Sequence, residues 1–178
     1  MIVFDTETTG LPKPSSVPLE EQPKIIEFAA IKLDNKTLKE TDRVEFLLNP
    51  EEKLDPVITK ITGLKDEDLI GQPLFVEQYP LLADFFLGER EMVAHYVAFD
   101  RSLLEFDLRR IDKLMQFPWP IKHTCTVEAS YPLKNFRLKL TQLHEIVTGS
   151  PHKEAHRAMA DVEALATCVR WLRKKGMM

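Results

Sequence analysis

The pattern of apolar and polar positions predicts strands in the first third of the chain and mostly helices after it. Three short apolar runs separated by turn residues predict a β-meander, with strands within 2–10, at 25–33 and at 43–48. Apolar residues at spacings of three and four predict helices around 56–61, 73–86, 99–115, 138–147 and 155–174. A further short strand is predicted at 92–95, and the segment 123–131 fits no single pattern. Strands followed by alternating strands and helices are typical of an α/β sandwich on a mixed sheet.

The last predicted helix carries a carboxylate on its apolar side. At 100° per residue, one stripe of that helix contains Ala158, Val162, Leu165, Val169 and Leu172. Asp161 lies within the stripe, and a carboxylate that faces a core needs a partner. An arginine, a buried hydrogen-bond network or a metal ion would each meet that need.

Length and charge limit the class of protein. With 178 residues and 44% hydrophobic side chains, the chain is expected to form a single domain over residues 1–178. Its 28 acidic residues against 24 lysine and arginine residues give a net charge of -4, which disfavours tight binding of nucleic acid through charge alone. An acidic enzyme that carries cations in its site remains compatible with this composition.

Two cysteines and the absence of a long apolar run suggest a soluble cytoplasmic protein. Cys125 and Cys168 stand outside any CxxC or Cys/His pattern, so reduced thiols are expected, with a disulfide left open. The sequence shows no leader-like segment and no apolar stretch near the roughly 20 residues that span a bilayer. We therefore expect no membrane association.

Two carboxylates lie side by side at the end of the first predicted strand. Asp5 and Glu7 are two residues apart, so their side chains share one face of the strand. Like charges in a buried setting raise each other's pKa unless a cation compensates them. A divalent metal ion is the simplest such cation, and a merely solvated strand end is the alternative. A segment with four prolines, 12–23, forms a loop beside the pair.

Two further acidic or basic candidates lie near helix starts. Asp100 stands where a strand runs into a helix, a position where aspartate commonly serves as an N-terminal cap. His156 precedes Asp161 by five residues, on or just before the first helical turn, where histidine is often only a surface or capping residue. Both could also face one cleft together with Asp161.

Taken in order, these residues form three short motifs. They are Asp5–Gly10 (Asp-Thr-Glu-Thr-Thr-Gly), His95 with Asp100, and His156 with Asp161 in the spacing His-x-x-x-x-Asp. Together they resemble the DEDDh exonucleases, the DnaQ-like family that includes the proofreading epsilon subunit of bacterial DNA polymerase III and the three-prime repair exonucleases.

The resemblance extends over nearly the whole chain, with one departure. Residues 24–30, 61–64 and 135–143 are similar to the family's second strand, its substrate-facing helix and loop, and the segment before its third motif. Family members commonly have asparagine after the second-motif histidine, where this chain has Tyr96. That asparagine is not a metal ligand, so the departure concerns how the terminal nucleotide is held.

The resemblance implies a fold and a reaction. The fold would be ribonuclease H-like, a mixed five-stranded sheet with flanking helices. The reaction would be metal-dependent 3'-5' hydrolysis of phosphodiester bonds, with release of nucleoside 5'-monophosphates. The implied metal ligands are Asp5, Glu7, Asp100 and Asp161. Because carboxylates suit hard cations, two Mg²⁺ or Mn²⁺ ions are expected. His156 would act as the general base.

The resemblance also implies how a substrate would bind. The expected substrate is the 3' end of single-stranded DNA, with RNA and mismatched duplex ends as further possibilities, so the choice between DNA and RNA stays open. Backbone amides at Thr8 and Thr9 would hold the last nucleotides, Leu11 and Ile61 would wedge between bases, and His95 would lie on the substrate side. Ordinary core packing is the alternative for Leu11 and Ile61. Whether the chain acts alone or on a polymerase is open.

Two other functions compete with this one. A catalytically silent module of the same fold would bind nucleic acid or a polymerase, but it would be expected to lack a carboxylate or the histidine, and none is missing here. A dinucleotide-dependent enzyme would need a G-x-G-x-x-G run after Phe4, and prolines stand where its first helix should begin.

Overall fold

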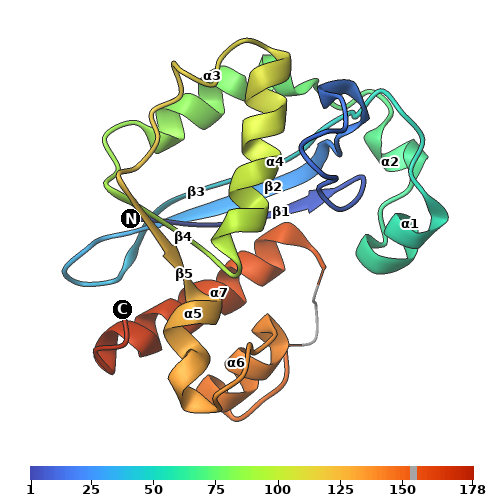
Figure 1. Ribbon diagram of the computed structural model, residues 1–178. Helices are drawn as coiled ribbons and strands as arrows, with labels where there is room; N and C mark the ends of the chain where they lie inside the picture. The colour runs from blue at the N-terminus through green and yellow to red at the C-terminus, as the bar shows by residue number, and fades with distance from the viewer. Residues whose placement is uncertain (153–155) are drawn as a thin grey trace.

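The computed structural model describes residues 1–152 and 156–178, which form one mixed five-stranded sheet with helices on both faces (Figure 1). The strands are β1 (Ile2–Thr8), β2 (Ile25–Leu33), β3 (Glu40–Leu47), β4 (Glu91–Ala94) and β5 (Lys122–Cys125). The helices are α1 (Pro56–Thr62), α2 (Asp66–Leu69), α3 (Phe75–Phe86), α4 (Val97–Arg110), α5 (Thr126–Ser130), α6 (Leu140–Thr148) and α7 (Ala158–Lys174), with short 3₁₀ turns η1 (Leu19–Glu21) and η2 (Tyr131–Leu133). The predicted α/β fold with a mixed five-stranded sheet is confirmed.

Strand order shows how the sheet is built. It runs β3-β2-β1-β4-β5, with β1, β2 and β3 antiparallel and with β4 parallel to both β1 and β5. The predicted β-meander is therefore correct. Because β1 is followed by an antiparallel strand, its connection differs from the strand-helix unit of a dinucleotide-binding fold.

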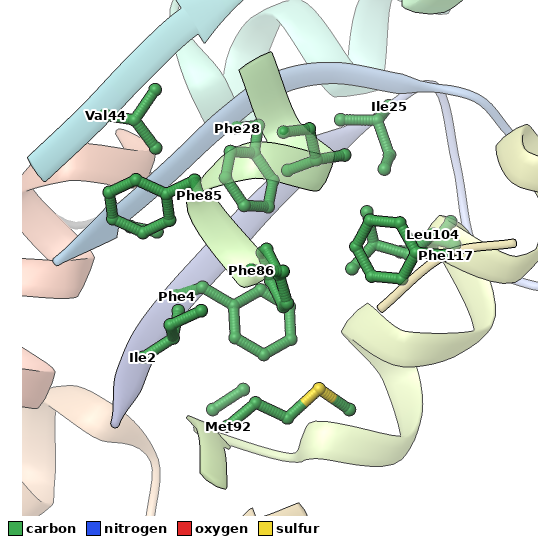
Figure 2. Close-up of a cluster of buried hydrophobic side chains, with 14 of the residues drawn as sticks. Ile2, Phe4, Ile25, Phe28, Val44, Phe85, Phe86, Met92, Leu104 and Phe117 are labelled. Carbon is green, nitrogen blue, oxygen red and sulfur yellow. The ribbon is translucent and has the colours of Figure 1, made fainter. Parts of the chain in front are cut away.

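Two apolar layers hold helices against the two faces of the sheet. On one face, Phe4 and Phe28 of the central strands pack on Phe86 of α3, with ring centroids about 6 Å apart, and α4 completes the layer (Figure 2). On the other face, α7 lies along β1 and β2 (Figure 1). The stripe predicted for this helix is confirmed, since each of its five apolar residues is 0% exposed.

Several element bounds differ from the sequence prediction. The helix predicted at 99–115 spans Val97–Arg110, because Tyr96 and Asp112 on either side have positive φ angles of 81° and 53°. The strand predicted to reach His95 ends at Ala94. The last helix begins at Ala158, and its predicted start at residue 155 lies outside the described residues. Helices α2 and α5 have four and five residues, too few to show a helical period.

Two simpler expectations can also be compared with the structure. Cys125 and Cys168 are both buried and carry free thiols, so the open disulfide alternative is wrong. Within residues 1–152 and 156–178, the helices are all too short or too polar to cross a bilayer.

Candidate active site

The pairing between β1 and β4 stops early and leaves one edge of β1 open. The two strands pair only at Ile2 with Met92 and at Val3 with Val93. Beyond this point the Thr6 N–H, in place of a strand partner, donates to Asp100 Oδ1 at 3.2 Å, and Thr6 Oγ1 donates to the same oxygen at 2.8 Å. The first turn of α4 is thereby fixed beside the carboxyl end of β1.

A cavity of about 820 Å³ opens at this end of β1, between the first turn of α4, the helix α1 and the approach to α7. All ten residues predicted from the sequence line it: Asp5, Glu7, Thr8, Thr9, Leu11, Ile61, His95, Asp100, His156 and Asp161. Segments far apart in sequence therefore meet at one place, as the three motifs require.

The two carboxylates of β1 face α7, where the positive charge of Arg157 offsets only part of the repulsion that acts on Glu7. Within the described part of the chain, neither the Asp5 nor the Glu7 side chain accepts a hydrogen bond. Burial, followed by repulsion from Asp100 and Asp161, holds the pKa of Asp5 well above its usual value. Burial and the negative charge of Asp161 likewise raise the pKa of Glu7 to about 8. The predicted repulsion between these carboxylates is present.

These shifts predict how the stability of the metal-free protein depends on pH. Because the pKa of Glu7 rises from 4.5 to about 8 on folding, the folded protein holds more protons than the unfolded chain between those values. Stability should therefore fall as pH increases across this window. Thermal melts in EDTA from pH 5 to 8.5 should show a decline in wild type that is weaker in Glu7→Gln. If the melting temperatures of the two proteins changed in parallel with pH, the raised pKa of Glu7 would be contradicted.

Asp100 differs from a second buried carboxylate on the same helix. Asp107 accepts hydrogen bonds from the Ile25 N–H at 3.0 Å and from Arg110 at 2.6 Å, so a cation compensates its charge. Among the described residues no cation contacts Asp100, which accepts hydrogen bonds from Thr6, and burial raises its pKa to about 7. Tyr96 occupies the N-cap position, so Asp100 is not the N-cap residue, although it lies in the first turn of α4, where the helix dipole favours a carboxylate.

Asp161 is held by two donors, one of which the sequence did not reveal. Its Oδ2 accepts the His156 N–H at 2.7 Å, and its Oδ1 lies 2.8 Å from Nε2 of His152. The candidate ligand atoms of Glu7, His156 and Asp161 lie within 4.8 Å of one another. Carboxylates that lack a cation, together with an imidazole, form a donor set that fits a divalent ion.

His95 supports the cavity wall through both ring nitrogens. Nδ1 lies 2.9 Å from Thr126 Oγ1, and Nε2 lies 3.0 Å from the Leu138 carbonyl oxygen. Burial lowers the pKa of His95, which favours the neutral ring. Because the carbonyl can only accept, Nε2 donates to Leu138 and Nδ1 accepts from Thr126. His95 thus ties the segment before α6 to the sheet.

Tyr96 has an unusual backbone conformation. Its φ of 81° and ψ of 56° are left-handed, a region that asparagine tolerates better than other residues with side chains. Tyr96 is also absent from the residues that line the cavity. Tyr96 therefore begins α4 in a backbone conformation that is unfavourable for a residue with a bulky side chain.

Apolar side chains form the opposite rim of the cavity. Leu11 is 76% exposed and Ile61 is 47% exposed, so core packing does not account for either residue. Ile61 belongs to α1, whose start is capped by Asp55 through the Val57 N–H at 2.8 Å and whose end is formed by Gly63 with φ of 75°. Ile61 therefore lies on a short helix that is capped at both ends.

Comparison with known proteins identifies the class of this site. Residues 2–169 match the RNase_T exonuclease family model. The PolC-type DNA polymerase III of Halalkalibacterium halodurans is 38% identical over 168 residues, which cover 92% of this chain and 10% of the polymerase. The chain belongs to the DEDDh exonuclease family. The corresponding polymerase of Bacillus subtilis is 31% identical over 169 residues, 93% of this chain and 11% of that protein.

Solved structures of exonucleases show the same fold. The nuclease domain of 3'hExo bound to rAMP has a TM-score of 0.74 at 19% identity, over 98% of this chain and 92% of that one. The zinc-bound complex of E. coli ExoI with single-stranded DNA has a TM-score of 0.75 at 19% identity, over 98% and 40%. The chain spans about a tenth of the length of the curated polymerases that it matches.

Proposed function

We propose that this chain is a metal-dependent 3'-5' exonuclease that hydrolyses phosphodiester bonds at the 3' end of single-stranded DNA and releases nucleoside 5'-monophosphates. The observation that carries the proposal is the convergence of Asp5, Glu7, Asp100, Asp161 and His156 on one cavity. The raised pKa values of Asp5, Glu7 and Asp100 support it, because such a cluster is disfavoured unless cations bind there.

The four carboxylates would hold two Mg²⁺ or Mn²⁺ ions. Glu7 and Asp161, which lie near His156, would hold one ion, Asp100 would hold the other, and Asp5 would contribute to both. Bound ions of this kind supply positive charge to the phosphate and to the attacking and leaving oxygens. The oxygen donors of the carboxylates favour Mg²⁺ or Mn²⁺. The imidazole of His156 lies nearby, and imidazole is also a common ligand of Zn²⁺. A direct comparison of activity with these metals is therefore informative.

His156 would take the proton from the attacking water. Its side chain is exposed at the cavity, and its backbone N–H is fixed on Asp161 Oδ2 at 2.7 Å. An imidazole side chain can both accept and release a proton, which suits the role of a general base. In this proposal the four carboxylates bind cations and take no part in proton transfer.

The substrate would enter between Leu11 and Ile61, whose exposed side chains can wedge between bases of any sequence. The Thr9 N–H already donates to the Lys24 carbonyl at 2.9 Å, so of the predicted pair we assign the terminal nucleotide to the Thr8 amide. Lys139 lines the opposite side of the cavity and offers a positive charge to a phosphate.

The proposal has a further part: the chain acts in the cytoplasm on DNA and docks on a polymerase. The polymerase relatives support this part.

A direct test of the substrate compares 5'-labelled single-stranded DNA, duplex DNA with a mismatched 3' end, and short RNA, each with Mg²⁺ and with Mn²⁺. Fastest loss of nucleotides from single-stranded DNA is expected. Faster degradation of RNA would reverse the proposed substrate preference.

Metal binding should be visible without any substrate. Mg²⁺ or Mn²⁺ should raise the melting temperature in a concentration-dependent way, because a ligand that binds only the folded state stabilises it by mass action. Calcium should also stabilise the protein but support little hydrolysis, since its looser coordination orients the reacting groups poorly. Activity restored after chelation by Zn²⁺ and not by Mg²⁺ or Mn²⁺ would contradict the preference for hard cations.

A catalytically silent binding module of the same fold is the alternative function. It would bind single-stranded DNA with the same cavity and leave the DNA intact under every metal condition. The complete set of carboxylates and the histidine in this cavity favours the enzyme.

A further inference from the structure

Glu27 is a fully buried carboxylate beside the active site. It is the third residue of β2, lies directly opposite Glu7 in the antiparallel pairing of β1 with β2, and is 0% exposed. Its carboxylate accepts hydrogen bonds from Arg157, from Nη2 at 2.9 Å and Nε at 3.2 Å, and from the Ala158 N–H at 3.1 Å. Both Arg157 and Ala158 belong to the start of α7, about 130 residues away in sequence.

These contacts fix the first turn of α7 on the sheet. The first N–H groups of a helix have no partner within the helix, and Glu27 supplies one from a distant strand. Its negative charge also lies at the favourable end of the helix dipole. Asp161 follows one turn later and donates its own N–H to the Arg157 carbonyl at 2.9 Å. The position of the Asp161 carboxylate therefore depends on where Glu27 holds Arg157 and Ala158.

The same contacts stabilise an unfavourable backbone conformation at His156. Its φ of 71° lies in the left-handed region, which costs energy for a residue with a side chain. Such a conformation persists only where neighbouring contacts determine it. On one side the His156 N–H is bonded to Asp161, and on the other side Arg157 and Ala158 are bonded to Glu27.

We propose that Glu27 is a positioning residue for the reaction: through Arg157 and the Ala158 N–H it sets the placement of His156 and Asp161. The proposal rests on the proposed function. It requires Glu27 to act through these neighbours and not as a metal ligand, because its carboxylate is fully buried and already carries three donor groups.

The structure offers a matched control at the other end of the same helix. Glu91 of β4 is 8% exposed and accepts two hydrogen bonds from Arg173 of α7, both at 2.6 Å. This pair also ties α7 to the sheet, but neither residue lines the cavity. Glu27→Gln and Glu91→Gln each remove one buried negative charge from a contact between the sheet and α7.

The experiment measures thermal stability, kcat and KM on single-stranded DNA, and Mn²⁺ affinity by calorimetry, at a temperature well below each melting point. Glu27→Gln should lower kcat and Mn²⁺ affinity by about 10- to 100-fold, the range typical of residues that orient metal ligands, with little change in KM. Glu91→Gln should lower only the melting temperature. Arg157→Lys keeps the charge but loses the forked contact, and should show a smaller loss in the same two quantities.

Two outcomes would overturn the proposal. One is wild-type kcat and Mn²⁺ affinity in Glu27→Gln. The other is an equal loss of kcat in Glu27→Gln and Glu91→Gln that follows their melting temperatures, since that would show general stability alone. A wild-type protein that binds Mn²⁺ and hydrolyses nothing would instead overturn the proposed function, and Mn²⁺ affinity would then decide the role of Glu27.

Discussion

Asp5→Asn should lower hydrolysis of single-stranded DNA by about a thousand-fold or more, because the several kcal/mol of charge stabilisation that bound cations provide would be lost. The folded protein should tolerate the change well. Burial and the neighbouring carboxylates raise the pKa of Asp5, so its charge is a cost to the metal-free fold. In EDTA, the melting temperature of Asp5→Asn should equal or exceed that of wild type.

Asp161→Asn provides the contrast for this prediction. Asp161 accepts hydrogen bonds from His152 and from the His156 N–H, so its replacement should also abolish hydrolysis but should not stabilise the metal-free protein. A clear drop in the melting temperature of Asp5→Asn in EDTA would mean that Asp5 has a structural role. Retained hydrolysis in Asp5→Asn would remove it from the metal site.

His156→Ala should lower kcat by about 10²- to 10⁴-fold, the usual contribution of a general base. The affinity for Mg²⁺ or Mn²⁺ and the KM should change little, because the proposed ligands of these hard cations are the four carboxylates and not the imidazole. Raising the pH makes proton removal from water easier without the histidine, so the variant should recover part of its rate in alkaline buffer. The measurement is a pH profile of kcat for wild type and variant.

His152→Ala is the matched comparison for the general base. His152 contacts Asp161 at 2.8 Å but is not among the residues that line the cavity, so its loss should have a smaller effect on kcat and no recovery in alkaline buffer. If His152→Ala behaved as predicted for His156→Ala, the base would be assigned to the wrong histidine. Near wild-type kcat in both variants would exclude a histidine base.

Local sequence patterns were sufficient for much of the fold. The nine residues predicted for the second strand match β2, because continuous apolar β-formers bounded by turn residues encode a buried strand. The stripe on α7 also matched, since a helical period repeats over several turns. The start of α4 did not match, because the left-handed conformation of Tyr96 is a single-residue feature that leaves no periodic signal in the sequence.

The site shows the same division between local and distant information. Asp5, Glu7 and Asp161 could be found because each interrupts an apolar strand or stripe. The contact of Glu27 with Arg157 joins residues 130 apart, which no local pattern encodes. A signal was nevertheless present, since Glu27 is the one acidic residue inside the apolar second strand. His152 gave no comparable signal, because it lies in a polar segment outside any periodic element.

The direction and metal dependence of hydrolysis test the central claim most directly. A 5'-labelled single strand with a free 3' end is compared with the same strand carrying a blocked 3' end, in Mn²⁺, in Mg²⁺ and in EDTA. The account predicts a ladder of progressively shorter labelled products and free nucleoside 5'-monophosphates from the unblocked strand, and no products from the blocked strand or in EDTA. Cleavage of the blocked strand, or hydrolysis that persists in EDTA and in Asp5→Asn, would contradict it.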